Sequence, residues 1–133
     1  MTYCIKTPLA ALTVAMSLTG ASAAMANPTG LWKTEPDRKG QTAHVRAQPC
    51  DSGFCGTIVD VFGPNGQEVD APTVGTRVFW NMTPEGGGTY EGRAYVPAHD
   101  RSYRAQMELM GSRMEVSGCL GPICQSQTWT RVR

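Results

Sequence analysis

The 133-residue sequence has no long apolar run after residue 26, and it has no excess of charge of either sign. A membrane-spanning helix takes about 20 apolar residues, so we expect no transmembrane anchor. With residues 1–26 set aside, Lys6 leaves the count and the 12 basic residues become 11 (12 − 1), against 11 acidic ones. A chain of balanced charge exerts no net attraction on nucleic-acid phosphates, and a nucleic-acid partner is excluded.

The sequence is also poor in catalytic groups. It has only two histidines, no G-x-S-x-G nucleophile motif, no C-x-x-C redox pair and no glycine loop typical of a phosphate site. His44 falls on the polar side of an alternating segment, and His99 falls in a turn beside Asp100, where adjacent side chains usually point apart. We therefore predict a protein that is not an enzyme, with no catalytic residues, no metal and no cofactor. A hydrolase that uses His99 and Asp100 is the remaining enzymatic alternative.

Residues 1–26 have the pattern of a signal peptide that is cleaved on export. An apolar run follows Lys6, and Ala24-Met25-Ala26 fits the A-x-A cleavage pattern. Cleavage there leaves residues 27–133 as one domain, in the periplasm or outside the cell. A cut after Ala23 is the alternative.

Export removes Cys4 and leaves an even set of four cysteines: Cys50, Cys55, Cys119 and Cys124. Four cysteines allow three connectivities. Both pairs have the spacing C-x4-C with turn-forming residues between them, which favours Cys50–Cys55 and Cys119–Cys124 as bridges at the necks of two hairpins. A four-thiolate zinc site is the rival interpretation, but export to an oxidising compartment favours disulfides.

Almost every segment after residue 27 alternates between apolar and polar residues with period two, and none has a sustained helical period. We count about eight such segments, separated by turn signals such as Pro64-Asn65-Gly66 and Gly86-Gly87-Gly88. Eight short antiparallel strands can close into a barrel, which leaves no exposed sheet edge. The predicted fold class is therefore all-β: a small antiparallel up-and-down β-barrel of about eight strands with two hairpin disulfides. The stretch Glu68 to Thr76 is expected to be a loop at a barrel mouth.

Alternation also predicts which side chains point inward. In the alternating segment 77–82, it places Trp80 and Met82 inside the barrel and Phe79 outside. A barrel of eight strands is just wide enough to be filled by side chains or to hold one small ligand, so both outcomes stay open. The candidate cavity-lining residues are Trp80, Met82, Tyr90, Tyr103, Met107 and Leu109.

The two ends of the domain carry a family resemblance. Gly30-Leu31-Trp32 near the start and Trp129-Thr130-Arg131 near the end resemble the lipocalin, or calycin, pattern. That resemblance implies that Arg131 packs over Trp32 and closes one end of the barrel through a cation–π contact.

The chain as a whole resembles the DUF2147 family of exported bacterial proteins, whose function is unknown and whose fold is a lipocalin-like barrel. The resemblance rests on stretches spread over residues 30–131: Gly30 to Thr34, Cys50 to Val59, Tyr90 to Tyr95 with Pro97, Asp100 and Tyr103, and Gly118 to Arg131. The sequence departs from the family between Gln67 and Arg77, where the middle segment is shorter, and at Arg101, where the family has glycine.

Two functions are compatible with these features. The first is a non-enzymatic periplasmic or secreted barrel that binds a small apolar or amphipathic ligand. The second is a structural or protein-interaction module of the cell envelope with a filled barrel, which contacts an envelope protein through loops such as Glu68 to Thr76.

Overall fold

The computed structural model describes residues 10–11, 13–15 and 27–133. The signal peptide expected over residues 1–26 lies largely outside the described residues. Within the described ranges, no helix is long and apolar enough to cross a membrane.

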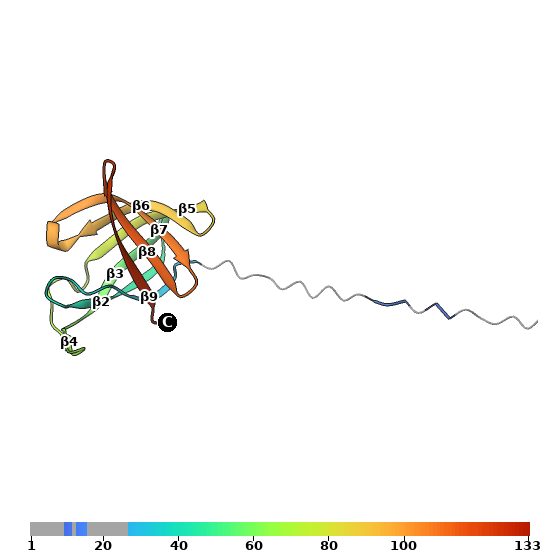
Figure 1. Ribbon diagram of the computed structural model, residues 1–133, viewed down its shortest axis with the longest axis horizontal. Coiled ribbons are helices and arrows are strands. Elements are labelled where there is room, and N and C mark those ends of the chain that lie inside the picture. The colour runs from blue at the N-terminus through green and yellow to red at the C-terminus, as the bar shows by residue number, and fades with distance from the viewer. Residues whose placement is uncertain (1–9, 12, 16–26) are drawn as a thin grey trace, which may run out of the picture.

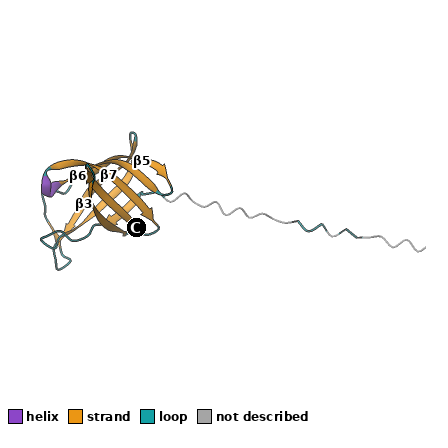
Figure 2. Ribbon diagram, turned by 45° about the horizontal axis from the view of Figure 1, so that its top comes forward, coloured by secondary structure: helices purple, strands orange, loops and turns teal. Residues whose placement is uncertain are grey.

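The described chain forms strands joined by short turns, with one 3-10 turn, η1 (Pro97–His99), between the sixth and seventh strands. Eight of the strands form a closed antiparallel ring, and β4 is added at the edge of β3 outside the ring. Figures 1 and 2 show this barrel with its strands tilted across one another. The strands are β1 (Gly30–Lys33), β2 (Thr42–Cys50), β3 (Gly53–Phe62), β4 (Glu68–Val69), β5 (Arg77–Gly86), β6 (Thr89–Val96), β7 (Arg101–Met110), β8 (Arg113–Leu120) and β9 (Ile123–Arg131).

The predicted all-β barrel of about eight strands is confirmed. Ring closure depends on two pairings that join distant segments of the chain: β2 with β3, and β1 with β9. Because successive residues of a strand point to opposite faces, alternating sequences bury one face inside the ring and leave the other in water. The buried core inside the barrel is Trp32, Val45, Ala47, Ile58, Val61, Val78, Phe79, Met82, Tyr90, Ala94, Ala105, Met107, Met114 and Trp129.

A β-bulge in β5 changes the predicted orientation of its side chains. Asn81 has a φ of 53°, in the left-handed region that asparagine tolerates better than most residues, and the register with β6 shifts there. The bulge inserts an extra residue into the alternation, so Phe79 and Met82 are both fully buried while Trp80 is only half-buried and outside the core. The predictions that Trp80 points inward and Phe79 outward were therefore wrong.

The two ends of the barrel differ. At one end, which we call the closed end, the chain enters through Asn27–Gly30 and leaves through Arg131. The other end, which we call the open end, carries the loops 34–41 and 63–76, η1 and the turn between β8 and β9, since turns alternate between ends in an up-and-down barrel. The predicted mouth loop Glu68 to Thr76 lies at the open end but contains the short strand β4, and Val69 packs against the core.

Candidate functional site

The closed end is built around Trp32. Its side chain is 0% exposed, and its indole N–H donates a hydrogen bond to the carbonyl oxygen of Pro28 (2.8 Å). Arg131 pairs directly opposite Trp32 across β9 and β1, with its guanidinium carbon 4.4 Å from the centre of the indole ring. The same guanidinium donates to the carbonyl oxygens of Thr29 (2.7 Å) and Asn27 (3.2 Å). These contacts join the entering and leaving chain and seal this end.

The interior is packed with side chains. Phe79, Met82, Met107 and Met114 are each 0% exposed. Two hollows of the described chain are both open to solvent on the outside of the barrel. Of the six residues predicted to line a cavity, Met82, Tyr90 and Met107 belong to the packed core, and Leu109 packs against it. Tyr103 is half-buried at the open end, and Trp80 lies outside the core. The structure thus brings most of the predicted set together as core.

The two predicted disulfides are present. Cys119 and Cys124 lie directly opposite each other on β8 and β9, with their Cα atoms 4.1 Å apart. Cys50 and Cys55 are also bridged, with Cα atoms 5.9 Å apart, but diagonally, because Cys55 lies opposite Gln48 in the ladder. The two bridged cysteines therefore lie directly opposite each other in one hairpin only. The turn between β2 and β3 consists of Asp51 and Ser52. Cys50 therefore lies opposite Gly53, and Cys55 lies two residues further along β3.

The two bridges differ in exposure, which predicts different reactivity towards reductant. Cys124 is exposed on β9, whereas Cys55 is buried at 1% exposure. Thiol–disulfide exchange needs access to sulfur, so mild dithiothreitol should open Cys119–Cys124 while Cys50–Cys55 stays closed in the folded protein. Alkylation followed by peptide mass spectrometry measures this. Equal labelling of both pairs under native conditions, or earlier labelling of Cys55, would contradict it.

The hairpin of β8 and β9 stands out from the barrel (Figure 1). Its tip has two exposed apolar side chains, Leu120 (62% exposed) and Ile123 (71%), which face each other across the turn just beyond the Cys119–Cys124 bridge. A disulfide one residue from the turn joins the two strands just below the tip. The hairpin is therefore a bridged projection with an apolar end.

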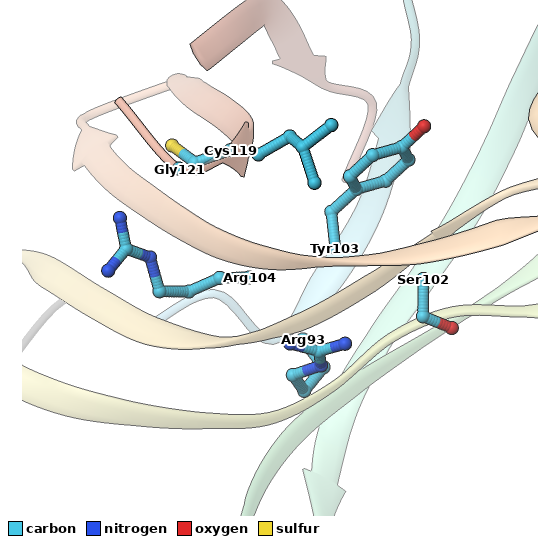
Figure 3. A pocket seen from close by; sticks show the side chains of 7 residues that line it. Arg93, Ser102, Tyr103, Arg104, Cys119 and Gly121 are labelled. Carbon is cyan, nitrogen blue, oxygen red and sulfur yellow. The ribbon is translucent and has the colours of Figure 1, made fainter. Parts of the chain in front are cut away.

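A hollow of about 320 Å³ lies beside this hairpin. Figure 3 shows Arg93 and Arg104 on neighbouring strands near the segment Cys119 to Gly121, with Tyr103 pointing away from them. The hollow combines guanidinium groups, two hydroxyls and an apolar side chain. Its lining is Arg93, Ser102, Tyr103, Arg104, Cys119, Leu120 and Gly121.

The two arginines of the hollow are an unfavourable pair by themselves. Arg93 and Arg104 are direct cross-strand partners on β6 and β7, and like charges in that position destabilise a sheet. Neither arginine makes an ion pair with any described residue. An anion placed between the two guanidinium groups would relieve their repulsion.

A second hollow, of about 230 Å³, lies on the outside of the barrel and is lined by Lys33, Thr42, His44, Phe62 and Gly66. His44 stacks at an angle on Phe62, with ring centroids 4.6 Å apart, and its Nδ1 lies 3.9 Å from a carboxylate oxygen of Asp60. Burial lowers the pKa of His44 below its ordinary value, against the opposing effect of Asp60. A neutral, stacked imidazole there acts mainly as part of the wall.

The turn around η1 separates the two residues of the enzymatic alternative. His99 Nδ1 lies 3.0 Å from the hydroxyl of Tyr103, while Asp100 accepts a hydrogen bond of 2.6 Å from the hydroxyl of Tyr95. That bond raises the pKa of Tyr95 above its ordinary value. His99 and Asp100 each contact a different tyrosine and are not hydrogen-bonded to each other, so they do not form a catalytic dyad.

Sequence reasoning missed the arginine hollow. Alternation places Arg93 and Arg104 on polar strand faces, but only the register of β6 with β7 makes them opposite neighbours. The sequence did contain a signal for the apolar hairpin tip. Leu120 and Ile123 flank the turn between Cys119 and Cys124, where polar residues are more usual.

The fold is similar to that of a solved structure. The chain is similar to protein HP1028 from the human pathogen Helicobacter pylori, which belongs to the lipocalin family, with a TM-score of 0.64 and 14% sequence identity, over 80% of this chain and 84% of that one. The protein is therefore a lipocalin-like β-barrel.

Its family follows from the sequence of that barrel. Residues 30–131 match the model of DUF2147, described as uncharacterized protein conserved in bacteria, and the chain belongs to this family. No curated protein matches the sequence. The recognised family and the lipocalin-like fold predicted from the chain are confirmed.

Proposed function

We propose that this protein is a non-enzymatic, exported binding protein that takes an anionic, amphipathic molecule in the hollow beside the β8–β9 hairpin. The observation that carries the proposal is the cross-strand pair of Arg93 and Arg104 without an acidic partner. Leu120, at the same hollow, offers an apolar surface for the uncharged part of the molecule. Ligand sites in proteins occupy about 300–1,000 Å³, and this hollow reaches the lower limit of that range at about 320 Å³.

The packed interior supports a binding site on the outside of the barrel rather than inside it. With Phe79, Met82 and Met107 fully buried, a ligand inside the barrel would have to displace core side chains. Loss of such packing costs about 2–5 kcal/mol for each large side chain. The outer hollow needs no rearrangement of the core. Two disulfides and the signal pattern of residues 1–26 support export to an oxidising compartment.

The test is binding of laurate below its micellar concentration, measured by isothermal titration calorimetry, with uncharged monolaurin as the comparison ligand. Wild-type protein is expected to bind laurate more tightly. The double variant Arg93→Gln, Arg104→Gln should weaken laurate binding at least tenfold, or about 1.4 kcal/mol, and leave monolaurin binding unchanged. Arg46→Gln, an exposed arginine on β2 outside the hollow, is the matched control and should bind as wild type does. Laurate binding that is absent, or equal in the double variant and wild type, would contradict the proposal.

The second candidate is a structural or protein-interaction module of the cell envelope with a filled barrel. The packed interior favours it, since a filled barrel needs no ligand. Crosslinking in intact cells followed by affinity capture distinguishes the two, because only this function requires a stable protein partner. A defined partner captured from wild type and from the Arg93→Gln, Arg104→Gln variant alike would favour the module over the ligand site.

A further inference from the structure

Strand β9 has a second strand beside it for only part of its length. On one side it pairs with β8 from Ile123 to Thr130. On the other side it pairs with β1 only at Thr130 and Arg131, because β1 ends at Lys33. Within the described chain, the outer part of β9 is thus a sheet edge on an otherwise closed barrel.

The backbone groups at this edge can be identified from the hydrogen-bond alternation. In an antiparallel pair, closely spaced opposite residues do not bond to each other and direct their N–H and C=O groups to the other side. Cys119 and Cys124 are such a pair, at 4.1 Å between Cα atoms. The N–H of Arg131 bonds to Ser112, towards β8, while that of Val132 bonds to Leu31, towards β1. The even-numbered residues of β9 therefore face away from β8.

Three residues at this edge offer unpaired backbone groups. They are Cys124, Ser126 and Thr128, and within the described part of the chain no backbone hydrogen bond to another segment reaches them. Cys124 and Ser126 are exposed, and Thr128 is half-buried. Each residue presents one N–H donor and one C=O acceptor in the spacing that an added β-strand requires.

The edge also lacks the usual protection against strand addition. Proteins shield free edges with charged side chains, proline or bulges. From Leu120 to Thr130 the sequence contains no charged residue, and its one proline, Pro122, lies in the turn rather than on the edge. The register of β8 with β9 is regular, without a bulge. Nothing on this edge opposes pairing with another strand.

We propose that the edge of β9 pairs antiparallel with β9 of a second copy of this chain, around a twofold axis at Ser126. This arrangement places Ser126 opposite its own counterpart, Gln125 opposite Gln127, and Cys124 opposite Thr128. All are uncharged, so the twofold brings no like charges together, and the donors and acceptors of the three edge residues are all satisfied. The self-complementary, uncharged edge is the reason for choosing a second copy rather than a foreign strand.

The side chains at the axis are compatible with close approach. The hydroxyl of Ser126 lies 2.8 Å from that of Ser117 on β8, so it is held within its own hairpin. The interface is short, since only Cys124 to Thr128 is free. Contacts below about 1,200 Å² are weak, and a dissociation constant between about 1 µM and 1 mM is expected. The dimer is independent of the ligand hollow, so its test does not depend on the proposed function.

Sedimentation of the exported, oxidised protein over a range of concentrations tests the proposal. Wild type should pass from monomer to dimer as concentration rises. Ser126→Pro removes an N–H that makes no bond within the monomer and should remain monomeric, whereas Ser126→Ala keeps the backbone donor and should dimerise. Ser126→Lys should also be monomeric at low salt and regain dimer at high salt, while Ser117→Lys on the neighbouring strand should dimerise at both. These lysine variants keep the proposal testable where the proline variant fails to fold.

Amide hydrogen exchange identifies the interface itself. In the monomer, the amides of Gln125 and Gln127 bond to β8 and should exchange slowly, whereas those of Ser126 and Thr128 should exchange fast. At high concentration the even-numbered amides should become protected as well. A protein that stays monomeric at all concentrations, or a dimer whose even-numbered amides remain unprotected, overturns the proposal. Protection that appears only on addition of a different protein also overturns it and assigns the edge to a foreign strand.

Discussion

Replacing Trp32 with alanine should remove about 3–5 kcal/mol from the free energy of unfolding, the usual cost of truncating a fully buried aromatic side chain. The side chain is 0% exposed at the closed end, where its N–H bonds to Pro28 and its ring lies under Arg131. Truncation leaves a cavity and takes away the surface on which the guanidinium packs. A domain of about 100 residues loses about 4–8 °C of Tm per kcal/mol, so the variant should melt more than about 12 °C below wild type.

Urea unfolding followed by circular dichroism measures this effect, and Trp80→Ala is the matched control. Trp80 is half-buried on β5 and outside the core, so its loss should cost clearly less. Arg131→Met isolates the cation–π contribution: a double-mutant cycle with Trp32→Ala should give a coupling of about 0.5–2 kcal/mol. A Trp80→Ala variant as unstable as Trp32→Ala would contradict the larger contribution of Trp32 to stability.

Replacing Gly56 with alanine should lower the free energy of unfolding by about 1–3 kcal/mol, the typical cost of overpacking a core. Gly56 lies on β3, and the ring of Phe79 on β5 lies so close that an added Cβ would overlap it. Phe79 is 0% exposed and is surrounded by core side chains, including Trp129, whose ring centroid is 6.1 Å away. The ring can therefore make room for a methyl group only by displacing core side chains around it.

Gly118→Ala is the control for this substitution. Gly118 also lies inside a strand, but its added Cβ would meet Tyr103 at 3.7 Å, an ordinary van der Waals distance. That variant should be as stable as wild type or slightly more stable, since alanine restricts the unfolded chain. In the Gly56→Ala background, Phe79→Leu should cost less than it does alone, because the smaller side chain makes room for the methyl group. Strict additivity of the two changes would argue against an overlap between them.

Local patterns in the sequence were sufficient for most of the fold. Period-two alternation with turn residues between segments determines that the chain forms strands, because only that period buries one face of a sheet. The short C-x4-C spacing predicted both disulfides, since a bridge within a hairpin depends on residues close in sequence. The resemblance of the chain ends predicted the pairing of Trp32 with Arg131, which lie 4.4 Å apart from guanidinium carbon to ring centre.

Other features required the tertiary structure. The bulge at Asn81 places Phe79 rather than Trp80 in the core. Its traces in the sequence are Asn81 itself and Gly92 opposite it, where an added Cβ would lie 2.6 Å from the carbonyl oxygen of Asn81. Whether the barrel is filled or hollow depends on how side chains from all strands meet in the centre. No single segment carries that information, since an eight-stranded barrel permits both.

The sequence by itself thus determined an all-β, disulfide-bridged chain, because alternation, hairpin spacing and turn residues are local properties. That the two ends of the chain meet was implied by the resemblance of Trp32 and Arg131 to the lipocalin pattern. Only the tertiary structure decided that Arg93 lies opposite Arg104, that Phe79 packs on Gly56, and that β9 extends beyond the end of its neighbour β1. These depend on the register between strands, and register is a long-range quantity: a shift of one residue would move every side chain to the other face.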